Sequence, residues 1–285
     1  MTIPNVAIED NHLSSVVCSA QYPASGTGAP GQHLVVASVT GPRNREKSTP
    51  CQDAWAYSLH SDTVVAVVCD GAGTAPRAQL GARVGSSLLA KTLARAKHDP
   101  ASDKPEARTA WRLAIEQGVE RARRLSTRLT TRSGDEGLED CHATVVGVVA
   151  SPQGGFFFHI GDGVGAACTQ VGRWSDCIVS RPENGEYANE TFFYTEAHWR
   201  QHLRITPFGP SEVILLMSDG PMPFVVEEDC SGIKLGFANP LATHFAKVTP
   251  ATAAQDLADT LNDSRAQRIS GDDKTLLWIY FEQDE

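Results

Sequence analysis

The chain has 285 residues, 41% of them hydrophobic and 21% charged, and its 34 acidic and 25 basic side chains give a net charge of −9. This composition is typical of a globular protein with one or two domains, and it excludes a fibrous or low-complexity chain. The acidic balance argues against non-specific nucleic-acid binding, which depends on cations that neutralise phosphates. No apolar run approaches the ~20 residues of a membrane span, so no membrane partner is expected.

The cysteines indicate a reducing compartment. There are seven of them, an odd number, and none forms a C-x-x-C pair. Neither a disulfide framework nor a zinc site is therefore expected. The N-terminal stretch MTIPNVAIEDNHLSS lacks the basic and apolar regions of a signal peptide. We therefore expect a cytoplasmic protein.

The first part of the chain predicts strands followed by two helices. Residues 1–32 contain the Gly/Pro-rich stretch QYPASGTGAPG and are expected to form an arm or loop. Three apolar runs of strand length follow, at 33–39, 55–59 and 63–69. Apolar residues then recur at helical spacing from Pro76 and again from about Pro105.

The second part returns to strands and ends on one. Strands are predicted at 143–150, 155–160, 164–171, 213–218 and 275–281, and helices within 239–268. Residues 172–210 carry RPENGEYANET and are expected to form an insertion or flap within a single domain that spans 33–285. This order of elements indicates antiparallel sheets with helices packed outside, rather than alternating βαβ units.

Aspartates stand at the ends of the strands that are predicted to be buried. They are Asp70, Asp162 and Asp219, each followed by glycine, together with Asp53, Asp272 and Asp273, which precede strands. A single Asp-Gly pair is common turn chemistry. If the strand ends converge, however, the carboxylates repel one another unless a cation binds between them. Oxygen ligands without His or Cys favour Mg²⁺ or Mn²⁺.

Short motifs in a fixed order carry a resemblance to a known family. They are PCQDA (50–54), DGAG (70–73), CHAT (141–144), HIGDG (159–163), MSDG (217–220) and GDDKT (271–275). The series resembles the PPM-type metal-dependent Ser/Thr protein phosphatases, the protein phosphatase 2C family, and most closely its bacterial branch. The resemblance implies an α+β fold, a four-layer α-β-β-α sandwich of two antiparallel sheets flanked by helices. It also implies that water activated by two Mg²⁺ or Mn²⁺ ions hydrolyses a phosphomonoester without a phosphoenzyme.

The resemblance also assigns roles to single residues. Asp70 corresponds to the carboxylate that bridges both metals, and the carbonyl of Gly71 to an additional ligand. Asp219 and Asp272 correspond to ligands of the second metal, and these two with Asp70 form the catalytic set. Asp162 corresponds to a residue that shares a third ion with Asp219.

Three further positions complete the implied site. Asp53 matches the second acid of the family's Glu-Asp pair and is expected among the metal ligands. Asp273 stands where the family has Asn, and we expect it, like Gln52, to lie behind the ligands.

The sequence departs from the family pattern in ways that bear on activity. Gln52 replaces the Glu of the pair, and Ala72 stands where eukaryotic members have a proposed general-acid His. The family's phosphate-binding Arg falls on Ser48. Cations in the same loop are the alternatives for that role: Arg43, Arg45 and Lys47.

The predicted function is a metal-dependent protein serine/threonine phosphatase. Its implied partners are a phosphorylated protein and the Ser/Thr kinase that phosphorylates it. The departures above leave open a non-catalytic or weakly active regulator of the same fold that binds a phosphoprotein. A third candidate function is hydrolysis of a small phosphate ester or nucleotide.

Overall fold

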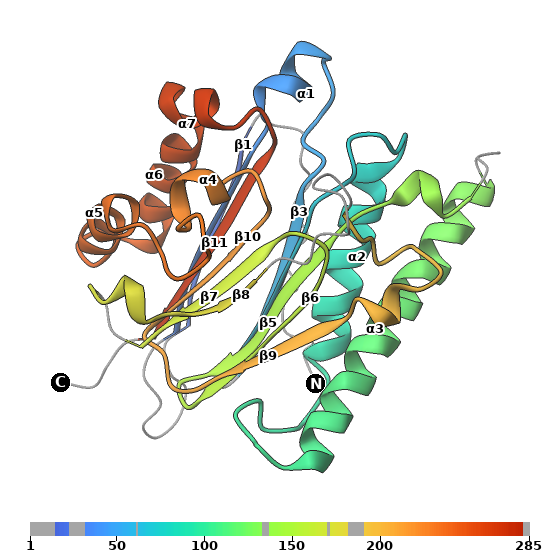
Figure 1. Cartoon of the computed structure of the whole chain (residues 1–285), viewed down its shortest axis with the longest axis horizontal. Helices are drawn as coiled ribbons and strands as arrows, with labels where there is room; N and C mark the ends of the chain where they lie inside the picture. The colour runs from blue at the N-terminus through green and yellow to red at the C-terminus, as the bar shows by residue number, and fades with distance from the viewer. Residues whose placement is uncertain are drawn as a thin grey trace.

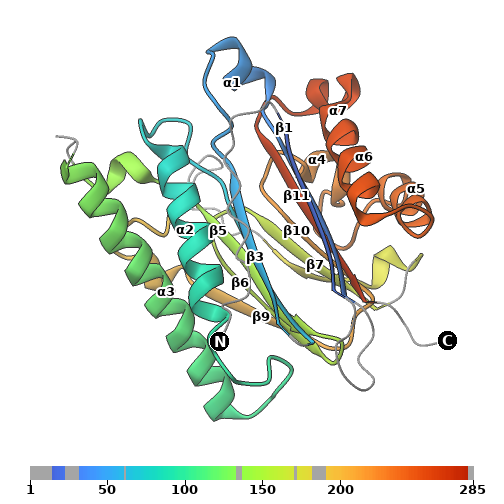
Figure 2. The same cartoon turned by 180° about the vertical axis from the view of Figure 1, so that it is seen from behind.

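Two antiparallel sheets stacked face to face form the centre of the protein (Figure 1). A computed structural model describes residues 15–22, 32–60, 62–132, 137–169, 172–181 and 191–281. Helices cover the outer face of each sheet, so the layers follow the order α-β-β-α (Figures 1 and 2). The predicted α+β sandwich is thereby confirmed.

The first sheet joins strands from both ends of the chain. Its order is β1 (Ser15–Tyr22), β2 (Gln32–Val39), β11 (Lys274–Phe281), β10 (Val213–Met217), β7 (Val164–Cys168) and β8 (Ile178–Ser180). All neighbours are antiparallel. The neighbouring strands β2 and β11 align Val39 with Lys274, so the beginning of the last strand lies beside the end of the second.

The second sheet keeps its strands in chain order. They are β3 (Ala54–His60), β4 (Thr63–Cys69), β5 (Val145–Ser151), β6 (Gly154–Ile160) and β9 (Arg204–Phe208). Strands β4 and β5 are antiparallel neighbours, although both long helices separate them in sequence. The end of β4 therefore meets the beginning of β5.

Helices pack on the two outer faces. α2 (Ala78–Leu93) and α3 (Pro105–Arg132) cover the second sheet, and α5 (Leu235–Phe245) and α6 (Pro250–Asn262) cover the first (Figure 2). Three short helices lie near the sandwich end that α1 marks in Figure 1: α1 (Pro42–Glu46), α4 (Met222–Val225) and α7 (Ser264–Ile269). Of the helices in the described part of the chain, none has both the length and the apolar character of a membrane span.

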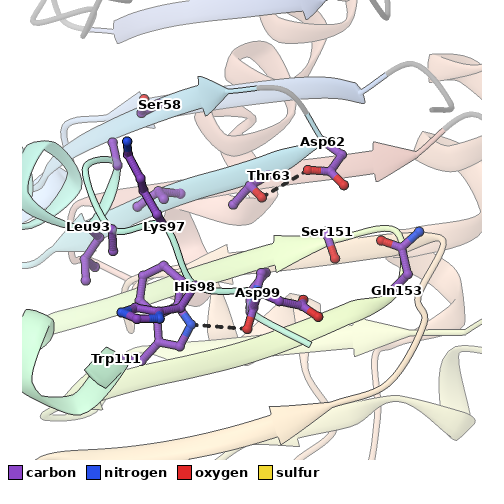
Figure 3. A pocket seen from close by; sticks show the side chains of 14 residues that line it. Ser58, Asp62, Thr63, Leu93, Lys97, His98, Asp99, Trp111, Ser151 and Gln153 are labelled. Carbon is purple, nitrogen blue, oxygen red and sulfur yellow. Dashed lines mark hydrogen bonds between the residues drawn. The ribbon is translucent and has the colours of Figure 1, made fainter. Parts of the chain in front are cut away.

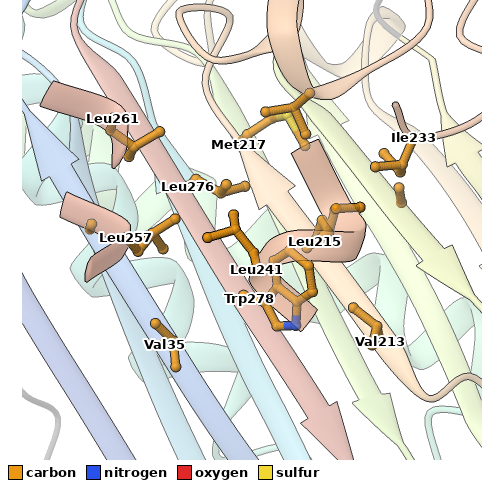
Figure 4. Close-up of a cluster of buried hydrophobic side chains, with 14 of the residues drawn as sticks. Val35, Val213, Leu215, Met217, Ile233, Leu241, Leu257, Leu261, Leu276 and Trp278 are labelled. Atoms are coloured by element: carbon orange, nitrogen blue, oxygen red, sulfur yellow. The ribbon is translucent and has the colours of Figure 1, made fainter. Parts of the chain in front are cut away.

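Three hydrophobic layers hold the sandwich together, one between the sheets and one under each pair of helices. Strand β11 contributes to two of them, because successive side chains of a strand point to opposite faces. Leu276 and Trp278 pack against the helices, near Leu257 of α6 (Figure 4), whereas Leu277 and Ile279 pack between the sheets. A strand buried on both faces reads as a continuous apolar run, as TLLWIYF does.

Two expectations about irregular segments are wrong in part. Residues 15–22, placed in an N-terminal arm, form β1, which pairs with β2; the rest of 1–32 except Gln32 lies outside the described residues. The region 172–210 supplies an edge strand to each sheet, β8 and β9, so much of it belongs to the sandwich rather than to a flap. Residues 182–190 lie outside the description. Short edge strands carry weak sequence signals because they pair on one side only.

The expectation of no disulfide is also wrong. Cys168, the last residue of β7, is bonded to Cys177, which directly precedes β8. The antiparallel register aligns Ala167 with Ile178, so the adjacent cysteines come side by side. Since β8 fell inside the predicted flap, the sequence offered no sign of this pairing.

Candidate active site

A cavity of about 640 Å³ opens at one end of the sandwich, where strands of both sheets end or begin. Five aspartates line it: Asp70 after β4, Asp162 after β6, Asp219 after β10, and Asp272 and Asp273 before β11. Antiparallel pairing explains the convergence, because the end of one strand lies beside the beginning of the next. The fold thus brings together aspartates that are up to about 200 residues apart in sequence.

The DGAG and CHAT motifs form one hydrogen-bonded unit at the floor of this cavity. The Asp70 N–H donates to Thr144 Oγ1 at 3.2 Å, and the Thr144 N–H donates to the Asp70 carbonyl at 2.8 Å. The Ala72 N–H donates to the carbonyl of His142 at 2.9 Å. A Cβ on Gly71 would lie 2.7 Å from the backbone carbon of Ala78, so only glycine fits there. The CHAT motif by itself did not predict this role of Thr144.

Asp70 and Asp219 are close enough to share a hydrogen bond between their carboxyl groups. Burial raises the pKa of Asp70 well above its ordinary value, and the charges of Asp53 and Asp219 raise it further. The pKa of Asp219 rises to about 6, first through burial and then through the charge of Asp162. Acids crowded in this way favour a cation among them.

Two buried oxygens of the cluster have no hydrogen-bond partner among the residues that the structure describes. They are Oδ1 of Asp162 and Oδ1 of Asp219. The other oxygen of Asp162, Oδ2, accepts a hydrogen bond from Thr191 Oγ1 at 2.7 Å. Nearly all buried polar atoms in proteins are paired, so two orphaned carboxylate oxygens at one cavity indicate a place for a bound ion. Nothing in the sequence pointed to Thr191.

The donor set fits a hard divalent cation, because it consists of oxygen atoms alone. Within the described ranges, however, no group of three or more His, Cys, Asp or Glu side chains is arranged so that it could hold a metal ion. Asp272 is one reason for this arrangement, because its Oδ1 accepts a hydrogen bond from the guanidinium group of Arg43 at 2.5 Å. To bind a metal, Asp272 would have to exchange that partner for the ion.

Asp53 occupies a different place from the one predicted. It is fully buried and does not line the cavity. Its Oδ2 accepts hydrogen bonds from Ser218 Oγ at 2.8 Å and from Thr275 Oγ1 at 2.7 Å. Burial and the charge of Asp273 raise its pKa to about 7. With one oxygen taken up by two hydroxyls, Asp53 supports Asp70 from behind rather than facing a metal in the cavity.

Asp273 holds the loop that contains α1. Its carboxylate accepts hydrogen bonds from the N–H of Gly41 at 2.7 Å, from the Asn44 side chain at 2.8 Å and from the N–H of Gln52 at 2.6 Å. Gln52 itself lines the cavity, and its side-chain oxygen accepts a hydrogen bond from Asn44 at 3.3 Å. Asp273 and Gln52 both line the cavity, and Asp273 is the one whose carboxylate binds the backbone of this loop.

The candidate phosphate-binding cations separate into two groups. Arg43 and Lys47 line the cavity, whereas Arg45 lies outside it and donates to the side chain of Asn262. Residues four apart share a face of a helical turn, and residues two apart do not. This spacing was available in the sequence and distinguishes Arg43 and Lys47 from Arg45.

A second cavity, of about 560 Å³, lies at the opposite end of β4 (Figure 3). It contains Asp62 and Asp99, which come from separate segments. Asp62 accepts a hydrogen bond from Thr63 at 3.3 Å, and Trp111 donates to the backbone carbonyl of Asp99. These acids do not form a cluster like that of the first cavity, which therefore remains the candidate site.

Solved structures with the same fold include protein phosphatases. A serine/threonine phosphatase of S. agalactiae superposes with a TM-score of 0.60 at 15% identity, covering 88% of this chain and 100% of that one. Serine-threonine phosphatase 2C from Toxoplasma gondii gives 0.59 at 13% identity, with coverages of 94% and 100%. RsbX in complex with magnesium gives 0.55 at 11% identity, with coverages of 94% and 100%. Identities this low show the fold alone.

The family is shown by sequence. The family model for protein phosphatase 2C matches residues 40–262, a range that begins before α1 and contains Asp70, Asp162 and Asp219. A sequence search of curated proteins gives no match. Since the family match spans most of the chain, including the whole second sheet and three of the aspartates at the cavity, the chain belongs to the protein phosphatase 2C family.

Proposed function

We propose that this protein is a Mg²⁺- or Mn²⁺-dependent protein serine/threonine phosphatase. The observation that carries the proposal is the convergence of five aspartates on one cavity, where two buried carboxylate oxygens lack a donor among the described residues. Family membership supports the same reaction. RsbX, whose fold is similar, is described in complex with magnesium, which supports the choice of ion.

The residues of the cavity divide into candidate ligands for two or three ions. Asp70 and the carbonyl of Gly71 would hold one ion, and Asp70 would share a second with Asp219 and Asp272. Asp162 and Asp219 would hold a third. When bound, paired divalent ions lower the pKa of a water molecule, which makes a hydroxide nucleophile available at neutral pH for in-line attack on phosphorus.

Side chains around the cavity supply positioning and charge. Asp53 lies close enough to Asp70 for its charge to act on that carboxyl, and Asp273 anchors the loop that contains Arg43 and Lys47. Cations at this position offset the negative charge that develops on the phosphoryl oxygens. We assign Arg43 a double role. Its guanidinium pairs with the Asp272 carboxylate when no metal ion is bound there, and it binds the substrate phosphate once an ion replaces it beside Asp272.

The proposed substrate is a phosphoserine or phosphothreonine of a protein, and the Ser/Thr kinase that makes it is the proposed counterpart. We keep the cytoplasm as the proposed location. The disulfide between Cys168 and Cys177 weighs against it, because disulfides are rare in cytosolic proteins.

The direct test is hydrolysis of p-nitrophenyl phosphate and of a phosphothreonine peptide by EDTA-treated protein, with and without Mn²⁺. We expect Mn²⁺-dependent turnover that Asp70→Asn reduces at least ~100-fold. The reason is that the other aspartates cannot replace a carboxylate that two ions share. Asp62→Asn, in the second cavity, serves as the matched control and should keep wild-type activity. Metal-independent turnover, or full activity in Asp70→Asn, would contradict the proposal.

A regulator without turnover is the second candidate. It is favoured by the ion pair between Arg43 and Asp272, which occupies a ligand position, and by the neutral Gln52 in the cavity. Calorimetric titration with Mn²⁺ beside the activity assay separates the two candidates. Metal binding with hydrolysis supports the phosphatase, whereas binding of a phosphopeptide without hydrolysis supports the regulator.

A further inference from the structure

Lys274, the first residue of β11, is a fully buried lysine whose three donors are all used. Its Nζ donates to the carbonyls of Ser270 and Asp272, each at 2.8 Å, and to the side-chain oxygen of Gln267 at 3.3 Å. An ammonium group carries three hydrogens and no acceptor. Lysine is almost never fully buried without such pairing. All three acceptors belong to the segment that leads into Asp272.

The stem of the same side chain meets the other acidic turn. A Cβ built on Gly220 would lie 3.1 Å from Lys274 Cγ and 1.9 Å from the carbonyl oxygen of Asp273. The turn that follows Asp219 therefore packs directly on Asp273 and Lys274. One buried side chain thus contacts the two turns that present Asp219 and Asp272 to the cavity.

The charge of Lys274 cannot by itself favour metal binding, because an ammonium group repels a divalent cation. Any favourable effect must come from the position that it gives the carboxylates. A buried backbone carbonyl that loses its donor is unfavourable, so the turn would rearrange if the ammonium were removed.

We propose that Lys274 is a positioning residue of the metal site, which fixes the Ser270–Asp272 turn through its ammonium and supports the Asp219–Gly220 turn through its stem. The inference rests on the proposed function in one respect only, that Asp219 and Asp272 hold a divalent ion together. Within the GDDKT motif, the lysine had no role in the sequence analysis.

The test is calorimetric titration of the metal-free protein with Mn²⁺. Lys274→Met keeps the length of the stem and removes every donor, and we expect its Kd for Mn²⁺ to rise ~10–100-fold. Lys274→Gln keeps an amide NH2 group as a donor, and the Kd of this variant for Mn²⁺ should rise less. Lys234→Met is the matched control: Lys234 also donates to a backbone carbonyl, that of Pro223 at 2.7 Å, but lies at the surface. Its Kd should stay within about twofold of the wild-type value.

A second readout separates positioning from a merely structural role. At saturating Mn²⁺, kcat of the Lys274 variants should return toward the wild-type value, because the carboxylates themselves are intact. A structural role alone would lower Tm and leave the Kd of the folded protein unchanged. If Lys274→Met does not fold by circular dichroism, Lys274→Gln decides.

The outcomes distinguish this inference from the proposed function. Folded variants that bind Mn²⁺ as tightly as the wild type, or more tightly, would overturn the inference. Wild-type protein that binds Mn²⁺ without hydrolysing phosphoesters would overturn the proposed phosphatase and leave the role of Lys274 standing. Wild-type protein that binds no Mn²⁺ would overturn both.

Discussion

The hydroxyl of Thr275 donates a hydrogen bond of 2.7 Å to the carboxylate of Asp53, across the interface between the two sheets. Thr275 lies on β11 of the first sheet, and Asp53 directly precedes β3 of the second. Ser218, at the end of β10, donates to the same oxygen. The floor of the acidic cavity is therefore a buried polar network that joins both sheets behind Asp70.

Removal of the Thr275 hydroxyl should weaken the fold and the site together. Thr275→Val preserves the shape of the side chain and takes a hydroxyl donor from a buried carboxylate, which costs about 1–3 kcal/mol. We expect the free energy of unfolding in urea to fall by that amount. Thr275→Ser, which keeps the hydroxyl, is the control and should lose less. Equal stability of Thr275→Val and wild type would show that the cross-sheet hydrogen bond contributes nothing.

Stability of the metal-free protein should fall as the pH rises. The pKa values of Asp53 and Asp219 are raised to about 7 and about 6. A carboxyl whose folded pKa exceeds its unfolded value of about 3.9 stabilises the fold fully below the unfolded pKa, and that stability is lost as pH rises through the folded pKa. The Tm of EDTA-treated protein should therefore decrease between about pH 4 and about pH 7.

Two variants and one metal ion test whether these carboxyl groups cause the decrease in Tm with rising pH. Asp219→Asn removes one of the titrating groups and should flatten the decrease in Tm, whereas Asp62→Asn in the second cavity should leave it unchanged. Saturating Mg²⁺ should raise Tm most at the high-pH end, where the carboxylates are ionised. A metal-free Tm that rises over this range would contradict the assignment.

Replacement of Arg43 should change metal and substrate binding in opposite directions. Arg43→Ala frees Asp272, so the Kd for Mn²⁺ should fall; the pair is exposed, with side chains 68% and 41% accessible, which limits the gain to about fivefold. The KM for a phosphopeptide should rise, because a cation at the cavity mouth is lost. Calorimetry and steady-state kinetics measure the two effects.

Arg45→Ala is the control for that experiment, since Arg45 contacts Asn262 outside the cavity. It should change neither constant by more than about twofold. Weaker Mn²⁺ binding by Arg43→Ala would indicate that the guanidinium supports Asp272 rather than competing for it.

Thiol titration of the unfolded protein should reveal the disulfide between Cys168 and Cys177. Of the seven cysteines, two should become reactive only after a reductant is added. The double variant Cys168→Ser with Cys177→Ser should show no such increase. If all seven react without reductant, the bond is absent in the protein as purified, which would agree with a reducing compartment.

The sequence by itself determined the elements and the chemistry that depend on local patterns. Strand β4 was predicted with the bounds Thr63–Cys69 that it has, because a long apolar β-branched run leaves few alternatives. The ordered motifs indicated both the family and the acidic cluster, since each aspartate stands directly at a strand end. Helix α6 lies within the predicted range 239–268 and begins for a local reason, because the Thr249 side chain caps it and Pro250 starts it.

Only the tertiary structure decided which of those residues face the cavity and which lie behind it. Asp53 and Asp70 both stand at the end of a predicted strand, yet the hydroxyls of Ser218 and Thr275 hold Asp53 in the interior while Asp70 reaches the opening. These contacts join residues on opposite sheets, and no periodicity within a segment carries information about them. Local order follows from neighbours in sequence, whereas the environment of a buried carboxylate follows from distant strands that meet only in the folded chain.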